Sequence, residues 1–335
     1  MSQAHDTAAL SLRRPTIIDV ARHAGVSKSL ASRALRGDPG VSSGSRERVQ
    51  QAAQELAYRL NSAARSLVRG VSGLIGVVLN EIGNQHHTGI VAGVEAHARS
   101  HNASVIISHG GNSPAELSRQ IDTLIELRVD GLVIVSSWVP HHTLERAGRE
   151  VPTVVVTQID DPPGMVDTIA SDDVAGAVLA VEHLIAAGRK RIAYLTRSAS
   201  ATSRARIRGV RQAAASAGVV CEVHELAHHD AAGLRALVTG RAHDAMLCNN
   251  DLTAAEVIRI AREAGIAVPG ELALIGYDNT PLAELVFPSL SSVNQPQYRM
   301  GERAGAAITE RLAGREQAIR EFHAPALVLR ASTPA

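Results

Sequence analysis

From Leu74 onward, short apolar runs alternate with longer stretches that have the spacing of amphipathic helices. The apolar runs are four to six residues long and continuous enough to form strands buried on both faces. Strands that alternate with helices in this way form parallel sheets with helices on both sides. We predict strands at 74–79, 104–108, 131–136, 153–156, 191–195, 245–248 and 272–277, and helices at 89–100, 116–127, 174–187, 204–217 and 252–264.

The number of these strands indicates two doubly wound sheets, and therefore two subdomains. The segment Ile159 to Gly164 contains the sequence DDPPG, which breaks regular structure. We place the change from the first subdomain to the second near this segment. Ligands in such folds bind at the carboxyl ends of the strands, which predicts a cleft between the two sheets.

The composition is that of an ordinary globular protein: 45% of the 335 residues are hydrophobic and 20% are charged. No stretch approaches the roughly eighteen uninterrupted apolar residues of a membrane span, and the N-terminus lacks the apolar core of a secretory leader. We therefore expect no membrane association and a cytoplasmic location. Cys221 and Cys248 are far apart, which fits a reducing compartment and argues against a structural zinc site.

The net charge of +1 conceals a marked asymmetry along the chain. Residues 13–70 hold eleven Arg and Lys against four Asp and Glu, a net charge of +7. Residues 71–335 hold 23 basic against 28 acidic residues, a net charge of −5. A small basic module joined to a larger acidic one is typical of a nucleic-acid-binding head on a body with another task.

The basic module has the pattern of three short helices. Thr16 and Asp19 have the spacing of a capping box at the start of the first helix. Gly25 ends that helix, and Ser27 can cap a second one that runs to about Leu35, which predicts a helix-turn-helix. A third helix is predicted from Ser45 to about Tyr58, with apolar residues that pack across the first two.

Ordered motifs then connect the two parts of the chain to a known family. The head contains TIIDVARHAGVS (16–27), SR (32–33), VSSGSRERV (41–49) and NSAARSL (61–67). The body contains VEHL (181–184), RARIRG (204–209), ND (250–251), VP (268–269), IGYD (275–278) and SSVNQP (291–296). Over residues 15 to about 330 the chain resembles the lactose-repressor (LacI/GalR) family of transcriptional regulators.

The resemblance implies a small all-α helix-turn-helix head on an α/β body of two doubly wound parallel-sheet subdomains, similar to periplasmic binding proteins. The expected organisation is a disordered arm at 1–14, a DNA-binding domain at 15–60, a hinge helix or linker at 61–70, and an effector-binding and dimerisation domain at 71–335.

In the family the second helix enters the major groove, which implies that Lys28, Ser29 and Arg33 face bases. Arg and Lys can donate to guanine, and Ser can bond several base edges. Leu67 would wedge open a central base step from the minor groove and so bend the DNA. The family usually has Thr-Val where this chain has Leu30-Ala31, which leaves the operator sequence open. The full set of implied DNA-binding residues is Thr16, Ile17, Ser27, Lys28, Ser29, Ser32, Arg33, Arg36, Asn61, Ala64 and Leu67.

Arg206, Asn250 and Asp278 stand at the positions that the family uses to hold its effector. We expect Arg206 and Asp278 to converge from the two subdomains, where an arginine and a carboxylate can bind vicinal hydroxyls of a sugar or nucleoside. Each has a structural alternative, since Asp278 could brace its own loop and Arg206 could lie on the surface of its helix.

Other predicted elements of the pocket rest on position alone. Asn80 and Trp138 follow strands, and Trp138 could stack on a sugar or simply pack. A strand-end aspartate common in the family is Thr157 here, which puts the contact it would supply in doubt. Asp251 is predicted to cap the helix that begins at Leu252.

We therefore predict a homodimeric repressor of a palindromic operator, controlled by a small-molecule effector of the sugar or nucleoside class. No cofactor, metal site or catalytic group is expected. The adjacent histidine pairs 86–87, 141–142 and 228–229 are interpreted mainly as surface residues, with the mouth of the cleft as the alternative place for His86 or His87. A stand-alone sugar-binding protein of the periplasmic type is the main alternative, and an enzyme is the weaker one.

Overall fold

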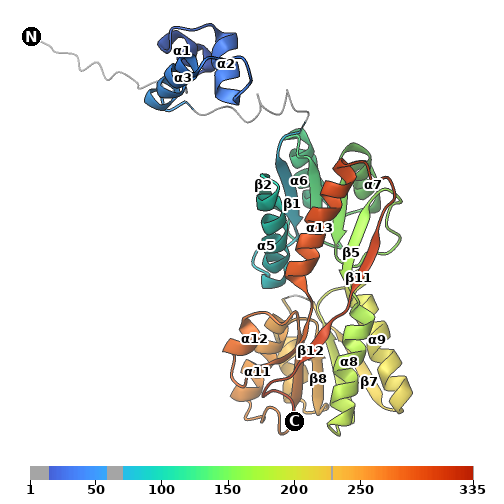
Figure 1. The fold of residues 1–335 in the computed structure, drawn as a ribbon. Helices are drawn as coiled ribbons and strands as arrows, with labels where there is room; N and C mark the ends of the chain where they lie inside the picture. Colours follow the sequence, from blue (N-terminus) through green and yellow to red (C-terminus); the bar gives the residue numbers. More distant parts are fainter. Residues whose placement is uncertain (1–14, 59–70, 228, 335) are drawn as a thin grey trace, which may run out of the picture. The chain divides into compact units, whose positions relative to one another are not determined.

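The computed structural model describes residues 15–58, 71–227 and 229–334 (Figure 1). The chain divides into two compact units, Met1–Ser72 and Gly73–Ala335. The predicted arm at 1–14 and the predicted hinge at 61–70, with Asn61, Ala64 and Leu67, lie outside the described residues. A helix that crossed a bilayer would have to be longer or more apolar than any helix in the described part of the chain.

The described part of the first unit, residues 15–58, is a three-helix head. Its helices are α1 (Ile17–His23), α2 (Lys28–Arg36) and α3 (Ser43–Glu55). The predicted capping box is present, because the amide of Thr16 donates to Asp19 Oδ2 at 2.8 Å and the amide of Asp19 donates to Thr16 Oγ1 at 3.4 Å. Ser27 caps α2 through the amide of Leu30, as predicted. The core consists of small side chains and two valines, namely Val20, Ala21, Ala24, Ala31, Ala34, Val49, Ala52 and Ala53.

The predicted bounds of the third helix were wrong at both ends. Helix α3 begins at Ser43 because the side chain of Ser42 accepts the amide of Ser45 at 3.3 Å. It ends at Glu55, since Ala57 adopts a φ of 48°, which no right-handed helix can continue.

The second unit contains two six-stranded sheets. The first has the order β11-β5-β4-β3-β1-β2, and all neighbouring strands in it are parallel. Its strands are β1 (Leu74–Leu79), β2 (Ser104–His109), β3 (Gly131–Val135), β4 (Thr153–Val156), β5 (Asp167–Ser171) and β11 (Arg320–His323).

The second sheet has the order β12-β10-β9-β8-β6-β7. It is parallel except at one edge, where β12 runs antiparallel to β10. Its strands are β6 (Arg191–Thr196), β7 (Val220–Glu225), β8 (Ala245–Cys248), β9 (Ala273–Tyr277), β10 (Ser291–Asn294) and β12 (Ala326–Val328).

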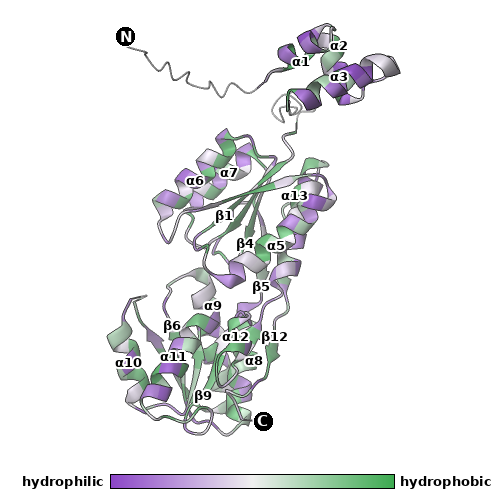
Figure 2. Cartoon of the chain, turned by 90° about the vertical axis from the view of Figure 1, so that its left-hand side faces the viewer, coloured by the Kyte–Doolittle hydropathy of each residue, from purple (hydrophilic) through white to green (hydrophobic). Residues whose placement is uncertain are grey.

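Helices cover both faces of each sheet, and the central strands are largely hydrophobic while the helices are hydrophilic on their outer sides (Figure 2). Helices α5 and α13 pack closely on the first sheet, where Gly93 and Gly301 allow the two backbones to approach. The helices of this unit are α5 (Gln85–Ser100), α6 (Pro114–Glu126), α7 (His141–Glu150), α8 (Asp173–Ala186), α9 (Ala201–Ala217), α10 (Ala231–Thr239), α11 (Asp251–Glu263), α12 (Leu282–Leu285) and α13 (Gln297–Leu312).

The fold confirms two parallel doubly wound sheets but corrects where the chain passes between them. We predicted the passage near Ile159 to Gly164, yet β5 follows that segment and still pairs with β4 in the first sheet. We call each sheet with its covering helices a lobe, the first lobe being that of the first sheet. The chain enters the second lobe only at α8, and α13 and β11 later return to the first. The missed strands β5, β7, β10, β11 and β12 are short, polar or at a sheet edge, so they lack a continuous apolar run.

Candidate functional site

The head presents a polar face on α2. Ala31 and Ala34 are buried, so the opposite side of this helix faces solvent. Thr16, Ile17 and Ser32 are partly buried. The predicted contact residues that are exposed are Ser27, Lys28, Ser29, Arg33 and Arg36.

Both arginines of this face are held by the head itself. Arg33 donates from Nη2 to the carbonyl of Pro39 at 2.7 Å. Arg36 donates to Asp38 Oδ2 at 3.1 and 2.7 Å and to Ser32 Oγ at 2.6 Å. The hydrogen bond from Arg36 lowers the pKa of Asp38. These bonds preorient both guanidinium groups, and each has donors left for another acceptor because a guanidinium carries five N–H groups.

A cavity of about 820 Å³ lies within the second unit, in the size range of small-molecule sites. It opens where the strands of both sheets end, so polar residues that follow the strands form much of its wall. The strand-following residues that line it are Asn80, Ser136, Thr157, Arg197, Asn249, Asp278 and Gln295.

Arg206 is the central charged group of this cavity and is only 6% exposed. Its Nε donates to Asp173 Oδ1 at 2.7 Å and its Nη1 to the carbonyl of Asn249 at 2.6 Å. Its guanidinium carbon lies 3.4 Å from the centroid of the Tyr277 ring, a cation–π contact. Burial is the largest single effect and opposes its charge, but Asp173, Asp278 and two tyrosines together outweigh burial and raise the pKa of Arg206.

Our prediction that Arg206 and Asp278 face each other across the cleft was wrong. Arg206 comes from α9 and Asp278 from the end of β9, and both elements belong to the second lobe. The first lobe contributes Asn80, His86 and Trp138 to the opposite wall. A ligand that bridges the two lobes therefore meets Arg206 and Asp278 on one side, and amide, imidazole and indole groups together with the carboxylate of Glu81 on the other.

Asp278 is held in an unusual backbone conformation. Its φ is 97° and that of Asn279 is 48°, in a region that side chains other than glycine rarely adopt. Gln295 Nε2 donates to its Oδ1 at 2.7 Å, and Gln297 donates to its carbonyl oxygen. Its side chain is 9% exposed, and its carboxylate oxygen lies 3.7 Å from Nδ1 of His86.

His86 is a site residue that our sequence prediction placed mainly at the surface. Its side chain is 14% exposed, and burial lowers its pKa to about 4, against the attraction of Asp278. The buried Nδ1 makes no hydrogen bond with another described residue. A neutral imidazole that lines a cavity with such an atom is equipped to bond a ligand. In contrast, His141 and His142 are exposed, as expected, and His228 lies outside the described residues.

We predicted that Asp251 caps the helix that follows it, and the structure corrects this prediction. Asn250, and not Asp251, caps α11, because its Oδ1 accepts the amide of Thr253 at 2.8 Å. Its side-chain NH2 group remains available toward the cavity. Asp251 instead accepts from Thr280 at 2.6 and 2.9 Å and from Ser292 at 2.6 Å. Burial and the charge of Asp278 raise the pKa of Asp251 to about 6.

The remaining predicted positions also line the cavity. Asn80 Nδ2 donates to Asn112 Oδ1 at 2.8 Å. Trp138 packs against an apolar cluster of the first sheet, which was one of its two predicted roles, and it also lines the cavity. Thr157 and Thr202 share a hydrogen bond of 3.1 Å between the lobes.

The sequence prediction missed several groups that line the cavity. Asp173 was missed because β5 was missed, so its place at the start of the second lobe was hidden. Gln295 belongs to a motif that we had noted without giving it a role. Taken together, the five predicted residues Asn80, Trp138, Arg206, Asn250 and Asp278 line one cavity, which is rich in amide, carboxylate and guanidinium groups. Such groups suit a ligand with several hydroxyls.

Comparisons with known proteins agree with this architecture. Residues 16–61 match the family described as "Bacterial regulatory proteins, lacI family", and residues 181–333 match the "Periplasmic binding protein-like domain". The chain is 30% identical over 334 residues to the HTH-type transcriptional regulator DegA of Bacillus subtilis (strain 168), which covers 96% of this chain and 98% of DegA.

Two solved structures are also similar over almost the whole chain. One is the lac repressor dimer bound to operator and the anti-inducer ONPF, with a TM-score of 0.83 and 28% identity over 96% of this chain and 100% of that one. The other is the complex of transcriptional regulator CelR with cellobiose, with a TM-score of 0.70 and 27% identity over 95% of this chain and 100% of that one.

Proposed function

The chain belongs to the LacI family of bacterial regulatory proteins, and on that premise we propose that it is a homodimeric repressor whose hold on a palindromic operator is controlled by a sugar or nucleoside-like effector. As a family member it is a DNA-binding transcription regulator with an effector-binding domain, and not an enzyme.

The polar cavity of about 820 Å³ is the observation that carries the effector proposal. Its charged groups Arg206 and Asp278 lie on the second lobe, while Asn80, His86 and Trp138 line the first. A ligand with hydroxyls on both sides would bond both lobes at once, and it would bind more tightly when they are closed around it. The cellobiose complex of CelR supports the sugar class, because that relative has the same fold.

Each residue has a distinct proposed role. Asp278 accepts from effector hydroxyls, and Arg206 donates with the N–H groups that Asp173 and Asn249 leave free. Asn250 donates with its side-chain NH2 group while its oxygen caps α11. Asn80 and Trp138 bind the effector from the first lobe. Asn80 forms a hydrogen bond with it, and Trp138 stacks on an apolar sugar face.

The exposed face of α2 is the proposed base-reading surface. Lys28, Ser29 and Arg33 read base edges in the major groove. Thr16, Ile17, Ser27, Ser32 and Arg36 position the head on the backbone, and Asn61, Ala64 and Leu67, which lie outside the described residues, form the hinge that the family resemblance implies. The lac repressor dimer bound to operator supports a two-fold arrangement.

Two measurements test the proposal. A thermal-shift screen of monosaccharides, disaccharides and nucleosides identifies compounds that stabilise the full-length chain, because a ligand that binds only the folded state raises the melting temperature. Operator DNA selected from a random library then reports affinity by fluorescence anisotropy with and without each hit. We expect a hit to change operator affinity by at least about fivefold. A stabilising compound that leaves operator affinity unchanged would contradict the coupling.

A stand-alone sugar-binding protein remains the competing interpretation only in the absence of a DNA-binding head. The three described helices of residues 15–58 and their basic face argue against it. In the DNA selection, enrichment of a palindrome supports the repressor, whereas no enrichment together with tight sugar binding would favour the alternative.

A further inference from the structure

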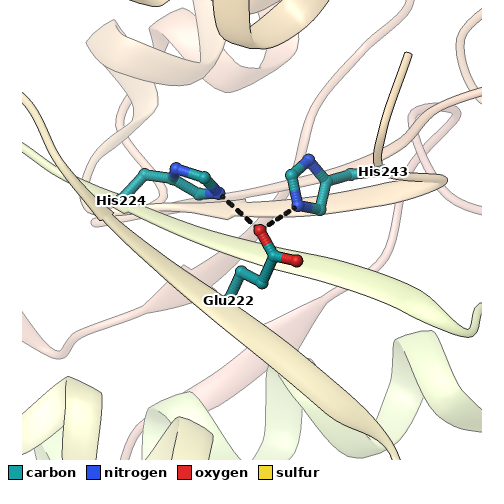
Figure 3. Close-up of side chains that lie close together, drawn as sticks. All are labelled: Glu222, His224 and His243. Carbon is teal, nitrogen blue, oxygen red and sulfur yellow. Dashed lines mark hydrogen bonds and ion pairs between the residues drawn. The ribbon is translucent and has the colours of Figure 1, made fainter. Parts of the chain in front are cut away.

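Two histidines and a glutamate meet on the second sheet, away from the cavity. Glu222 and His224 lie on β7, two residues apart and so on the same face of this edge strand. His243 reaches them from the loop between α10 and β8. Figure 3 shows both imidazole rings directed at the same carboxylate oxygen. His243 is 19 residues from His224 along the chain, so no short sequence motif contains all three residues. Our expectation of no metal site did not consider this cluster.

The carboxylate oxygen lies from each imidazole nitrogen at about the distance that separates two ligands of one zinc ion. Glu222 Oε2 lies 3.1 Å from Nε2 of His243 and 3.4 Å from Nε2 of His224. All three atoms lie within 4.8 Å of one another. Zinc bonds to nitrogen and oxygen are about 2.0–2.2 Å long, and corners of a tetrahedron with such bonds are about 3.3–3.6 Å apart. A cation placed among the atoms would therefore need only small side-chain movements.

The side chains are poorly satisfied without a cation. Nε2 of His224 is buried and makes no hydrogen bond with a described residue, although it points at the carboxylate. The side chain of His243 is 4% exposed and has Nε2 as its link to Glu222.

The backbone that carries His243 is fixed in advance. The next residue, Asp244, accepts the amide of Arg191 at 3.1 Å and donates its own amide to the Arg191 carbonyl at 3.0 Å. Glu222 and His224 are fixed by the pairing of β7 with β6. Two rigid elements thus present the ligands, as a built metal site requires.

We propose that Glu222, His224 and His243 form a binding site for a divalent transition ion of the zinc class. Two imidazoles and one carboxylate suit zinc, cobalt or nickel, whereas calcium and magnesium prefer oxygen ligands. The Glu222 side chain is 59% exposed, so the fourth position is open to water. The ion would fasten edge strand β7 to the loop before β8 and so stabilise this side of the second lobe.

The test uses full-length, tag-free protein that has been treated with EDTA and transferred to a non-chelating buffer. Titration with ZnCl2 by calorimetry, together with metal analysis, should give one ion per chain, and ZnCl2 should raise the melting temperature while MgCl2 should not. Glu222→Gln and His224→Gln should each weaken zinc affinity about tenfold or more, because even lost outer-shell partners cost that much.

Control variants separate this site from incidental histidine binding. The double variant His141→Gln/His142→Gln removes an exposed pair on α7 and should leave zinc affinity unchanged. Glu222→Gln should melt near the wild-type temperature without zinc, since its side chain is exposed. The proposal is overturned if wild-type protein binds no zinc, or if it binds zinc with the same affinity as folded Glu222→Gln.

Discussion

Nε of Arg206 lies 2.7 Å from Oδ1 of Asp173, and the two side chains are only 7% and 3% exposed. The pair joins α9 to the start of α8 beneath the cavity, and the ring of Tyr277 covers the guanidinium group. Arg206 therefore has a structural role besides its proposed contact with the effector. A buried ion pair contributes little relative to apolar replacements, but breaking it from one side leaves an uncompensated charge.

The first prediction follows from this pair. Arg206→Ala should lower the free energy of unfolding by about 3–5 kcal/mol, because Asp173 would stay buried without its partner. The double variant Arg206→Met/Asp173→Asn removes both charges and should lose clearly less. Urea unfolding of the three proteins measures this. Equal losses in the single and double variants would show that the charge left on Asp173 is not the cause.

The second prediction concerns effector recognition by Asp278. Asp278→Asn should weaken effector binding by about 1.5–3 kcal/mol, or about tenfold or more, because a charged acceptor is lost. Asparagine tolerates the positive φ of this position, so the loop should persist. Asp161→Asn is the matched control, since Asp161 also has a positive φ but is exposed and does not line the cavity. Calorimetry with the hit from the thermal-shift screen measures the effector affinity of both variants. An effector affinity of Asp278→Asn equal to that of the wild type would exclude this contact.

The third prediction is a pH dependence caused by His86. Its pKa in the folded state is about 4, below the ordinary value of 6.5, so the unfolded chain binds the proton more readily. The stability that depends on neutral His86 is fully present above pH 6.5 and is lost as the pH falls from about 6.5 to about 4. The full loss is on the order of 3 kcal/mol, at about 1.4 kcal/mol for each pKa unit.

His86→Gln should remove this contribution, so wild type should lose stability relative to the variant as the pH falls through that window. Asp251, whose raised pKa of about 6 acts with the opposite sign, is common to both proteins and largely cancels in the difference. His142→Gln, an exposed site, should keep the wild-type pH profile. Parallel profiles for wild type and His86→Gln would show that His86 does not titrate in this range.

The fourth prediction tests the contact between α5 and α13. A Cβ atom at Gly93 would lie 2.0 Å from the carbonyl oxygen of Tyr298 and 2.7 Å from the amide of Glu302. Gly93→Ala should therefore lower the free energy of unfolding by about 1–3 kcal/mol or more, because backbone cannot move aside as a side chain can. Gly164→Ala, with no atom within 4 Å of the added carbon, is the control. Thermal unfolding measures both variants. Equal losses of stability in Gly93→Ala and Gly164→Ala would show that α5 and α13 can move apart at no cost.

The fifth prediction concerns base reading by Arg33. Arg33→Ala should cost about 1–3 kcal/mol in operator affinity and relax the preference at one base pair of each half-site. Arg48→Ala, an exposed arginine on α3, should not relax any base preference. Anisotropy titrations against the selected operator and against random DNA compare the two. If Arg33→Ala lowers the affinity for the operator and for random DNA by the same factor, Arg33 contacts phosphate and reads no base.

Local pattern determined much of this protein. The capping box of Thr16 and Asp19, the cap of Ser27 and the buried runs of β1, β4 and β8 depend on neighbouring residues, so they could be predicted from the chain alone. The carboxyl ends of parallel strands share one edge, which is why Asn80 and Trp138, named for following strands, line the cavity. Arg206, Asn250 and Asp278, named from the family resemblance, line the same cavity.

Only the tertiary structure decided the rest, because it depends on which distant segments meet. The edge strand β7 is half exposed, so its alternating side chains gave no apolar run. The pairing of Arg206 with Asp173, the shared wall of Arg206 and Asp278, and the meeting of His243 with Glu222 all join residues 21 to 72 positions apart. Spacing along a chain fixes which side chains share a helix or strand face, whereas contacts between elements are fixed by packing the whole core.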